Sequence, residues 1–420
     1  MTRNWAEQIA SDFEGPPPGR EEKTRPDLVV LVSSVSRGII GGILEYLKPL
    51  QRLLPQHQIA VRTFLYPRTL NLMESRGLPK FARIWLHLAF VLLCLLRIAR
   101  LARRHRQVLV HSHGASYALL VGFLARIMGR PALHTFHSAN SRRSTTLRLV
   151  GRRLDGLVFA SESLEKEYKA SSGVANEVTY HIPGAVDVTL FHPADGVQKE
   201  VLRKTFLRQY GLPDRGTLVL FMGRITPEKG VLELIEAISV LRNRQCPTSA
   251  VLAGPCLDSS QAYLRHIEAR ISDLGLSEWV VLAGPVTHPT KVQLMAAADV
   301  FVCPSRWEGS PLSVAEALAS GVPVVATRVG GLVEQIPHGE AGLLVDESNP
   351  ARLADAIGSL LTSESTRLQM ARKAREHAVG VFGEDAFVEK HIALYAESVR
   401  RLMADQPPRG VRSSPGISSS

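Results

Sequence analysis

The chain contains 420 residues, 45% of them hydrophobic, and carries a formal net charge of +11. It is too long for one ordinary hydrophobic core, so we expect two domains of about 170 to 200 residues. Its four cysteines are scattered and form no C-x-x-C pair, which excludes a disulfide framework and favours a reducing cytoplasm.

The positive charge is concentrated in the first half of the chain. Residues 31–153 contain 20 Lys or Arg and 2 acids, whereas residues 211–420 contain 20 basic and 23 acidic residues. Such a field attracts anionic lipid surfaces, a phosphorylated acceptor or nucleic acid. Nucleic acid is the weakest of these partners and we expect none, because no RNP-like, helix-turn-helix or zinc-finger pattern accompanies the charge.

Both ends of the chain have compositions that favour disorder. Residues 1–26 are polar and charged and include "GPPPG", so we expect a flexible N-terminal extension rather than a signal peptide. Residues 404–420 are rich in Pro, Ser and Gly, and we expect a disordered tail there. Neither end is expected to carry the chemistry.

Between these ends, short apolar runs alternate with helical stretches, which is typical of parallel sheets flanked by helices. In the first half the expected strands cover residues 28–35, 59–66, 107–114, 132–137, 156–161 and 177–184.

The most apolar segment covers residues 84–96. As a helix, thirteen residues span about 20 Å, short of the roughly 30 Å hydrocarbon core, so a buried or interfacial helix is favoured over a membrane-spanning one. In the overlapping stretch 95–106, Arg97, Arg100 and Arg104 are expected on one helical face, as in interfacial helices. A docked core helix with a solvated basic end explains the same pattern equally well.

Glycines and histidines follow the first-half strands. Gly41 and Gly42 come after the first strand and permit close backbone approach to a ligand, although the pattern is not G-x-G-x-x-G. Four histidines near two strand ends suggest either a metal site or hydrogen bonds to an acceptor. The second interpretation is favoured, because no carboxylate or cysteine stands at ligand spacing beside them. They are His111, His113, His134 and His137.

The second half repeats the alternation, so we predict an α/β fold of two doubly wound, Rossmann-like domains. The domains are joined near residues 191–196, and a ligand cleft is expected between the carboxyl ends of their strands. The expected strands of the second half cover residues 217–223, 249–254, 279–284, 299–305, 323–328 and 342–346.

The stretch "FMGRITPEKG" ends a strand at Gly223, and a helix is predicted to begin near Glu228. Arg224 and Lys229 therefore stand at a strand-to-helix junction. Two cations there indicate a phosphate or diphosphate site, with the arginine able to bind two oxygens at once. Surface charges near a turn are the alternative interpretation.

The stretch "RWEGSPLSVAEALASGVPVVATRVGG" combines two acids with a short predicted helix at 311–320. Ser310 is the expected N-cap, and Gly321 is expected to end the helix in a left-handed conformation. Glu308 then lies in the loop at the ligand end of the sheet and Glu316 lies within the helix. An acid at a helix start is also a common stabilising device, so Glu308 alone is not decisive.

The order of "GRITPEKG", "VLAGP" and "EGSPLSVAEALASGVPVVATRVGG" resembles the retaining glycosyltransferases of the group 1 family (family four), which have the two-domain GT-B fold. The segments "HSHG", "HTFHS" and "IPGAVDVTLFHP" of the first half agree with this family. The resemblance runs from about residue 28 to 402. It implies an N-terminal acceptor domain at 27–193, a nucleotide-sugar domain at 197–385 and a crossover helix at 386–403 that returns to the first domain.

The resemblance implies roles for individual residues of the second domain. Arg224 and Lys229 would hold the diphosphate of a nucleotide-sugar donor, Glu316 would accept hydrogen bonds from the ribose, and Glu308 would accept them from the transferred sugar. Further donor contacts would come from Gly223, Gly309, Ser310, Leu312 and Ser313.

In the first domain the resemblance places His113 beside the reacting sugar. Gly41, Gly42 and His137 would lie on the acceptor side. The sequence departs from the family at Gly184, where the family usually has Asn, and this position lies on the acceptor side.

The implied reaction is transfer of a hexose-type sugar from a UDP- or GDP-sugar with anomeric retention. It needs no metal or other cofactor, because cations and helix amides stabilise the leaving diphosphate, and no Asp-x-Asp occurs in the sequence. The acceptor would be a glycan, lipid-linked or phosphorylated, reached from the cytoplasm, with a peripheral position on the inner membrane face. A catalytically silent binding module and a nucleotide-sugar epimerase remain as alternatives.

Overall fold

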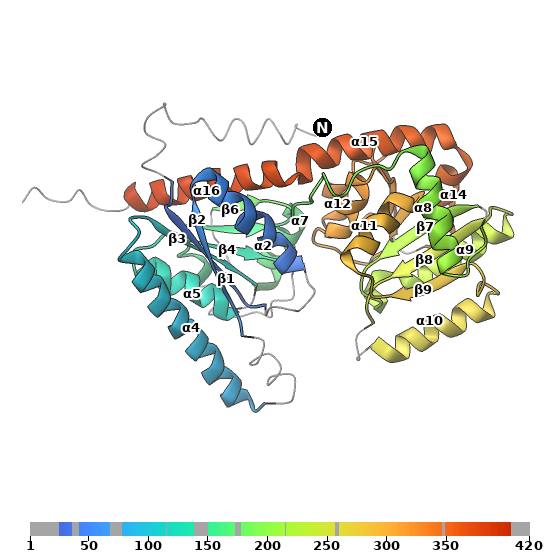
Figure 1. Cartoon of the computed structure of the whole chain (residues 1–420). Coiled ribbons are helices and arrows are strands. Elements are labelled where there is room, and N and C mark those ends of the chain that lie inside the picture. The colour runs from blue at the N-terminus through green and yellow to red at the C-terminus, as the bar shows by residue number, and fades with distance from the viewer. Residues whose placement is uncertain are drawn as a thin grey trace, which may run out of the picture.

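The computed structural model describes residues 25–35, 42–67, 78–114, 116–137, 150–172, 178–214, 216–256, 260–346 and 349–404. They form two α/β units side by side, joined along one edge by a long pair of helices (Figure 1). The expected terminal extension and tail lie almost wholly outside these residues, as does Gly41.

The first unit is built on a six-stranded parallel sheet with the order β2-β1-β3-β4-β5-β6. Runs rich in Val and Leu are expected in such strands, because a parallel sheet is covered on both faces. All six strands expected in this half are confirmed. They are β1 (Leu28–Ser33), β2 (Ala60–Leu65), β3 (Val108–His113), β4 (Ala132–Phe136), β5 (Gly156–Phe159) and β6 (Thr179–His181).

Alternate residues of strand β1, which lies between β2 and β3, pack against different helices. Val29 and Leu31 contact the core under α2 (Gly42–Leu53) and α16 (Glu384–Ala404). The neighbouring residues of β1 face α4 (Lys80–Ala102) and α5 (Ser116–Ile127). The remaining helices among the described residues of this unit are α7 (Glu162–Ser172) and the 3-10 helix η2 (Leu54–His57).

The second unit has a parallel sheet with the order β12-β11-β10-β7-β8-β9. Its six expected strands are also confirmed. They are β7 (Thr217–Met222), β8 (Thr248–Ala253), β9 (Val280–Gly284), β10 (Val300–Cys303), β11 (Val324–Thr327) and β12 (Gly342–Val345).

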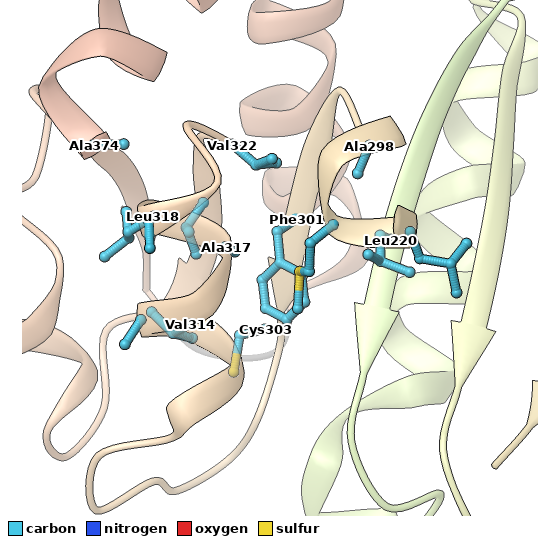
Figure 2. Packing of buried hydrophobic residues seen from close by; sticks show 14 of the residues in the cluster. Leu220, Ala298, Phe301, Cys303, Val314, Ala317, Leu318, Val322 and Ala374 are labelled. Atoms are coloured by element: carbon cyan, nitrogen blue, oxygen red, sulfur yellow. The ribbon is translucent and has the colours of Figure 1, made fainter. Parts of the chain in front are cut away.

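Helices cover both faces of the second sheet. On one face, Phe301 of β10 packs beside Val314 and Leu318 of α12 (Figure 2). The helices of this unit are α8 (Gly196–Gln209), η3 (Pro227–Lys229), α9 (Val231–Asn243), α10 (Gln261–Asp273), α11 (His288–Ala297), α12 (Leu312–Ala319), α13 (Leu332–Gln335), α14 (Pro350–Thr362) and α15 (Glu364–Phe382).

The last two helices connect the units. Helix α15 lies on the second unit, and α16 runs back over the first, where Phe387, Val388 and Tyr395 are buried in its core (Figure 1). The prediction of a C-terminal helix that returns to the first domain is therefore confirmed.

The strand orders place a ligand site in each unit. In the second sheet the order reverses between β7 and β10, and in the first it reverses between β1 and β3. Ligands of open α/β sheets bind outside the carboxyl ends of the strands at such a reversal. The loops after β7 and β10 contain Arg224 and Glu308, and β3 ends at His113.

Two local predictions were wrong in detail. The helix expected near Glu228 begins at Val231, because Gly230 in a left-handed conformation (φ 66°) separates the 3-10 helix η3 from α9. Helix α12 begins at Leu312, and its N-cap is Pro311 rather than the hydroxyl of Ser310. The left-handed Gly321 after α12 is confirmed, with φ 66°.

Candidate functional site

The loop after β7 is held against the end of β10 by Gly230. A Cβ atom at this position would lie 2.0 Å from the carbonyl oxygen of Pro304, so only glycine permits the approach. The amide of Arg306 donates to the carbonyl of Glu228 at 2.9 Å and closes the same contact. These contacts bring Lys229 to the acids that follow β10.

Glu308 lies buried at the centre of this junction, with 8% of its surface exposed. Its Oε1 accepts hydrogen bonds from Lys229 Nζ at 2.5 Å and from Ser305 Oγ at 2.8 Å. No hydrogen bond from the described residues reaches Oε2. Burial and the neighbouring Glu308 raise the pKa of Cys303 to about 12, so this thiol stays protonated beside the carboxylate. Glu308 therefore presents one oxygen that a ligand hydroxyl can contact.

Glu316 is buried about one turn into α12 and forms an ion pair with Lys291 of α11. Burial raises the pKa of Glu316, and the opposing charge of Lys291 lowers it. The ammonium of Lys291 also lies 5.2 Å from the ring centre of Phe191, within cation–π range. Sequence reasoning did not identify Lys291, which stands in the first turn of an unremarkable helix.

The segment between the two acids is held by contacts from both units. The carbonyl of Gly309 accepts a hydrogen bond from Ser161 Oγ at 2.7 Å, across the domain boundary. The amide of Gly331 donates to the carbonyl of Glu308 at 2.9 Å. The hydroxyl of Ser310 is buried and has no hydrogen-bond partner within the described residues. Buried polar groups are nearly always paired, so this hydroxyl is suited to a ligand contact.

Arg224 is exposed on the loop after β7. Within the described residues no ion pair occupies its guanidinium, in contrast to Lys229 on the same loop. It is therefore free to bind an anion. Gly223 stands between it and the strand, and Leu312 and Ser313 form the first turn of α12.

A second group of predicted residues lies in the first unit. His113 Nδ1 and His137 Nε2 are 3.3 Å apart, and the ring of Tyr46 lies beside both. His113 Nε2 is buried without a partner among the described residues. Burial, with smaller contributions from neighbouring histidines, holds the pKa of His113 well below its usual range, and burial lowers that of His137 to about 4. Both rings are neutral at pH 7.

The histidine group is anchored by residues of α16. His111 contacts Tyr395 at 2.9 Å and Thr135 at 2.7 Å, and Tyr46 contacts His391 at 3.2 Å. His391 also bonds to the carbonyl of the residue one turn before it. Sequence patterns gave no signal for these partners, which lie more than 280 positions from the histidines and tyrosine that they contact.

Within the described part of the chain, no three His, Cys, Asp or Glu side chains are grouped as metal ligands. The histidines instead bond to hydroxyl groups and to one another. Gly42, the other acceptor-side residue that can be placed, is the first residue of α2.

A cavity of about 490 Å³ lies between the two units. It is lined by α2 and α16 from one side, by Leu312, Glu316 and His288 from the other, and by the segment 185–191. Glu308, Arg224, Lys229 and His113 are not part of its lining. The cavity therefore marks the Glu316 end of the site.

A carboxylate bridges the two units next to the segment that carries Glu308. Glu334 of α13 accepts hydrogen bonds from the amides of Glu162 at 2.7 Å and Ser163 at 2.8 Å, and from Ser163 Oγ at 2.6 Å. These amides are the free donors at the start of α7, where a negative charge is stabilised. The bridge holds α7 against the second unit.

Two family models cover most of the chain. Residues 203–377 match the model described as Glycosyl transferases group 1, and residues 40–190 match the one described as Glycosyltransferase Family 4. The D-inositol 3-phosphate glycosyltransferase of Acidothermus cellulolyticus is 31% identical over 322 residues, covering 71% of this chain and 69% of the relative. The protein of the same name from Corynebacterium glutamicum is 32% identical, covering 71% and 74%.

Solved structures agree on the architecture. The Anabaena protein Alr3699/HepE in complex with UDP superposes with a TM-score of 0.66 at 23% identity, covering 86% of this chain and 98% of that one. Sucrose-phosphate synthase of Thermosynechococcus elongatus gives 0.70 at 22% identity, covering 90% and 100%. The fold is that of the GT-B glycosyltransferases, and the chain belongs to the group 1 glycosyltransferase family.

Proposed function

We propose that this chain transfers a hexose-type sugar from a UDP- or GDP-sugar to a hydroxyl group of an acceptor, with retention of the anomeric configuration. The observation that carries the proposal is the 2.5 Å contact of Lys229 with Glu308. It joins the loops after β7 and β10 at the reversal of the second sheet. A nucleotide sugar bound there would meet a carboxylate and cations side by side.

The donor would lie across the N-terminus of α12. Glu316 would bind the ribose hydroxyls at the cavity end, and Oε2 of Glu308 would bind hydroxyls of the sugar. The diphosphate would lie between them against Arg224 and Lys229, whose ammonium has two further N–H donors beyond its bond to Glu308. Additional contacts would come from Gly223, Gly309, the unpaired hydroxyl of Ser310, and the amides of Leu312 and Ser313.

Bond breaking at the anomeric carbon places positive charge on the sugar and negative charge on the departing phosphate. Arg224, Lys229 and the α12 amides would stabilise the phosphate. The acceptor oxygen would bond to the same face of the anomeric carbon, and its proton would pass to the departing phosphate oxygen. Neutral His113 would offer its unpaired Nε2 to the sugar, with His137 and Gly42 on the acceptor side.

In this proposal Arg224 and Lys229 stabilise the charge of the leaving diphosphate, as a divalent metal does in other transferases, and no cofactor is needed. The absence of Asp-x-Asp from the sequence supports this assignment. Transfer measured in excess EDTA should equal transfer in added Mg²⁺ or Mn²⁺. A rate that collapses in EDTA and returns with metal would remove this part of the proposal.

The acceptor is proposed to be phosphorylated or lipid-linked and to be used on the cytoplasmic side, at or near the inner membrane face. Two observations support this: the relatives are named for D-inositol 3-phosphate, and the acceptor-side half of the chain has a strong basic surplus. Anionic groups accumulate near such a surface.

The decisive experiment incubates the purified chain with a panel of UDP- and GDP-sugars and follows the donors by mass spectrometry. Inositol 3-phosphate and lipid extracts serve as acceptors, and NMR of the product reports the anomer. One donor should be consumed, with acceptor-dependent formation of a product of the same anomeric configuration. A donor that binds without turnover would indicate a silent module, and an epimerised donor without acceptor would indicate an epimerase.

A further inference from the structure

Helix α4 exposes large apolar side chains on the face that points away from the first sheet. A helix that only covered a sheet would carry polar side chains there. One face packs on the first sheet through Phe90, Val91, Cys94 and Ile98, all of them buried. The opposite face carries large apolar side chains, each between 44% and 69% exposed, at helical spacing. We call this set the α4 apolar face: Phe81, Ile84, Trp85, Leu88, Leu92, Leu93 and Leu96.

A contiguous apolar stripe of this length is unusual for the surface of a soluble domain, where exposed apolar side chains normally occur singly. The other exposed large apolar side chains of the described residues, such as Val197 and Val201 on α8 or Leu368 on α15, occur singly or in pairs and form no stripe of this length. Figure 1 shows α4 along the outer side of the first unit, with its N-terminal end extending beyond the sheet.

The charged side chains of α4 itself are all positive. The helix contains no acid, and Arg97 and Arg100 of its last turns are exposed. Arg103 and Arg104 follow directly after the helix end, so Arg104 is not part of the helical face predicted for it. The guanidinium of Arg97 lies 5.6 Å from the ring of Phe64 on the edge strand β2. A basic rim beside an apolar face with Trp and Leu is the pattern of a helix that lies in a membrane interface.

The length of α4 raises the question of whether the helix spans a membrane or lies parallel to its surface. The segment Phe81–Ala102 has 22 residues and contains an 18-residue window of mean hydropathy 2.0, enough to cross a bilayer by length and composition. The thirteen apolar residues at 84–96 are only part of this helix. Spanning would require α4 to leave the sheet and expose the core residues Phe90, Val91, Cys94 and Ile98 to lipid or water. An orientation parallel to the membrane surface keeps that core intact.

We propose that the α4 apolar face is a membrane-docking surface, which inserts into the headgroup and acyl-chain boundary of a bilayer containing anionic lipid. Residues 31–153 carry a surplus of 18 positive charges (20 basic minus 2 acidic residues). This charge repels the same domain of a second copy of the chain and attracts anionic lipid, so a second copy fits this surface less well than a membrane does. The surface is distinct from the donor site, so the proposal does not depend on the sugar or the acceptor.

The test is flotation of the full chain with vesicles of phosphatidylcholine alone or with 40% phosphatidylglycerol. The wild type should float with the anionic vesicles. Trp85→Glu/Leu92→Glu should lower the bound fraction at least tenfold, because two anchoring side chains become charged. The matched control Val197→Glu/Val201→Glu, at equally exposed sites on α8, should bind like the wild type. Circular dichroism checks that both variants fold.

Depth is measured by quenching of Trp85 with brominated lipids, after subtraction of the signal of Trp85→Phe. Bromine near the headgroup end of the acyl chain should quench more than bromine near the bilayer centre. Light scattering of the free protein reports its oligomeric state.

Three results would overturn the proposal. The first is a wild type that floats with neither vesicle, the second is binding that survives Trp85→Glu/Leu92→Glu, and the third is maximal quenching at the bilayer centre. A dimer that this double variant converts to monomers, without vesicle binding by either, would assign the surface to a second copy. Donor turnover in the soluble assay should be the same for both double variants, so failure here is separable from failure of the proposed reaction.

Discussion

Glu308 illustrates how one side chain depends on several segments of the chain. Its Oε1 atom accepts two hydrogen bonds, one from Lys229 in the loop after β7 and one from Ser305 in its own loop. The burial of this pair excludes water, which strengthens charge interactions. The second oxygen is left for a ligand hydroxyl.

Replacing Glu308 with Gln should therefore preserve the shape of the site and remove the charge that orients Lys229. We expect turnover to fall at least a hundredfold, with little change in the free energy of unfolding. Steady-state kinetics with the identified donor measure this, and Glu268→Gln at an exposed position of α10 is the matched control. A variant with wild-type kcat would take Glu308 out of the site.

Arg224 should contribute mainly to donor binding, since its guanidinium is exposed and forms no ion pair with the described residues. For Arg224→Ala we expect the Kd for the nucleoside diphosphate to rise about tenfold or more, as loss of a charged hydrogen bond implies. Calorimetric titration is the measurement, and Arg265→Ala on α10 removes an exposed arginine that is not part of this loop. Equal affinity in the two variants would contradict the assignment.

Helices α7 and α13 show how a contact between elements can hold the donor loop in place. Glu334 bonds to the first amides of α7, and Ser161 at the start of that helix bonds to the carbonyl of Gly309, next to Glu308. The bridge is exposed, so its contribution to stability is expected to be small. Its effect should appear in the separation of the domains.

For Glu334→Ala we expect a broader distribution of distances between spin labels placed on the two domains, and a donor KM raised about threefold to tenfold. The free energy of unfolding should change by less than about 1 kcal/mol. Glu340→Ala, a nearby exposed acid, should leave the distribution unchanged. If Glu334→Ala and Glu340→Ala gave the same narrow distribution, the bridge would not position the domains.

The C-terminal helix makes the stability of the first domain depend on residues at the far end of the chain. His391 and Tyr395 of α16 bond to Tyr46 and His111, and the group extends to His137. Burial lowers the pKa of His391 and His137 to about 4. In the unfolded chain these histidines titrate near 6.5.

The sign of the pH dependence follows. Below about pH 6.5 the histidines of the unfolded chain bind protons. The same buried histidines of the folded chain bind protons only near pH 4. Stability is therefore fully present above pH 6.5 and is lost as pH falls toward 4. Each such histidine should lower the free energy of unfolding at pH 5 by about 2 kcal/mol relative to its value at pH 7.5. Denaturant unfolding at the two pH values measures the loss.

His391→Asn should reduce this difference by about 2 kcal/mol, because one buried titrating group is removed. The exposed His57→Asn serves as the control and should retain the wild-type difference. If the loss of stability between pH 7.5 and pH 5 were identical in all three proteins, burial of His391 would not be a cause of it.

The sequence by itself determined the twelve strands, the two parallel sheets and which polar residues follow the strand ends. This worked because buried parallel strands are continuous apolar runs, and because Arg224, Lys229, Glu308 and Glu316 stand in short local motifs. It also identified the apolar segment of α4. The basic stretch after this segment was also expected to be helical, and the helix does continue to Ala102, but it ends before Arg104.

Only the tertiary structure decided which partners these residues have. Lys291 pairs with Glu316 from 25 positions away, Glu334 reaches α7 across the domain boundary, and His391 enters the histidine group from the last helix. Periodicity reports which face of an element is buried, but it carries no information on which distant element covers that face. That choice depends on packing and on charge pairing between segments, which exist only once the two domains and the returning helix have assembled.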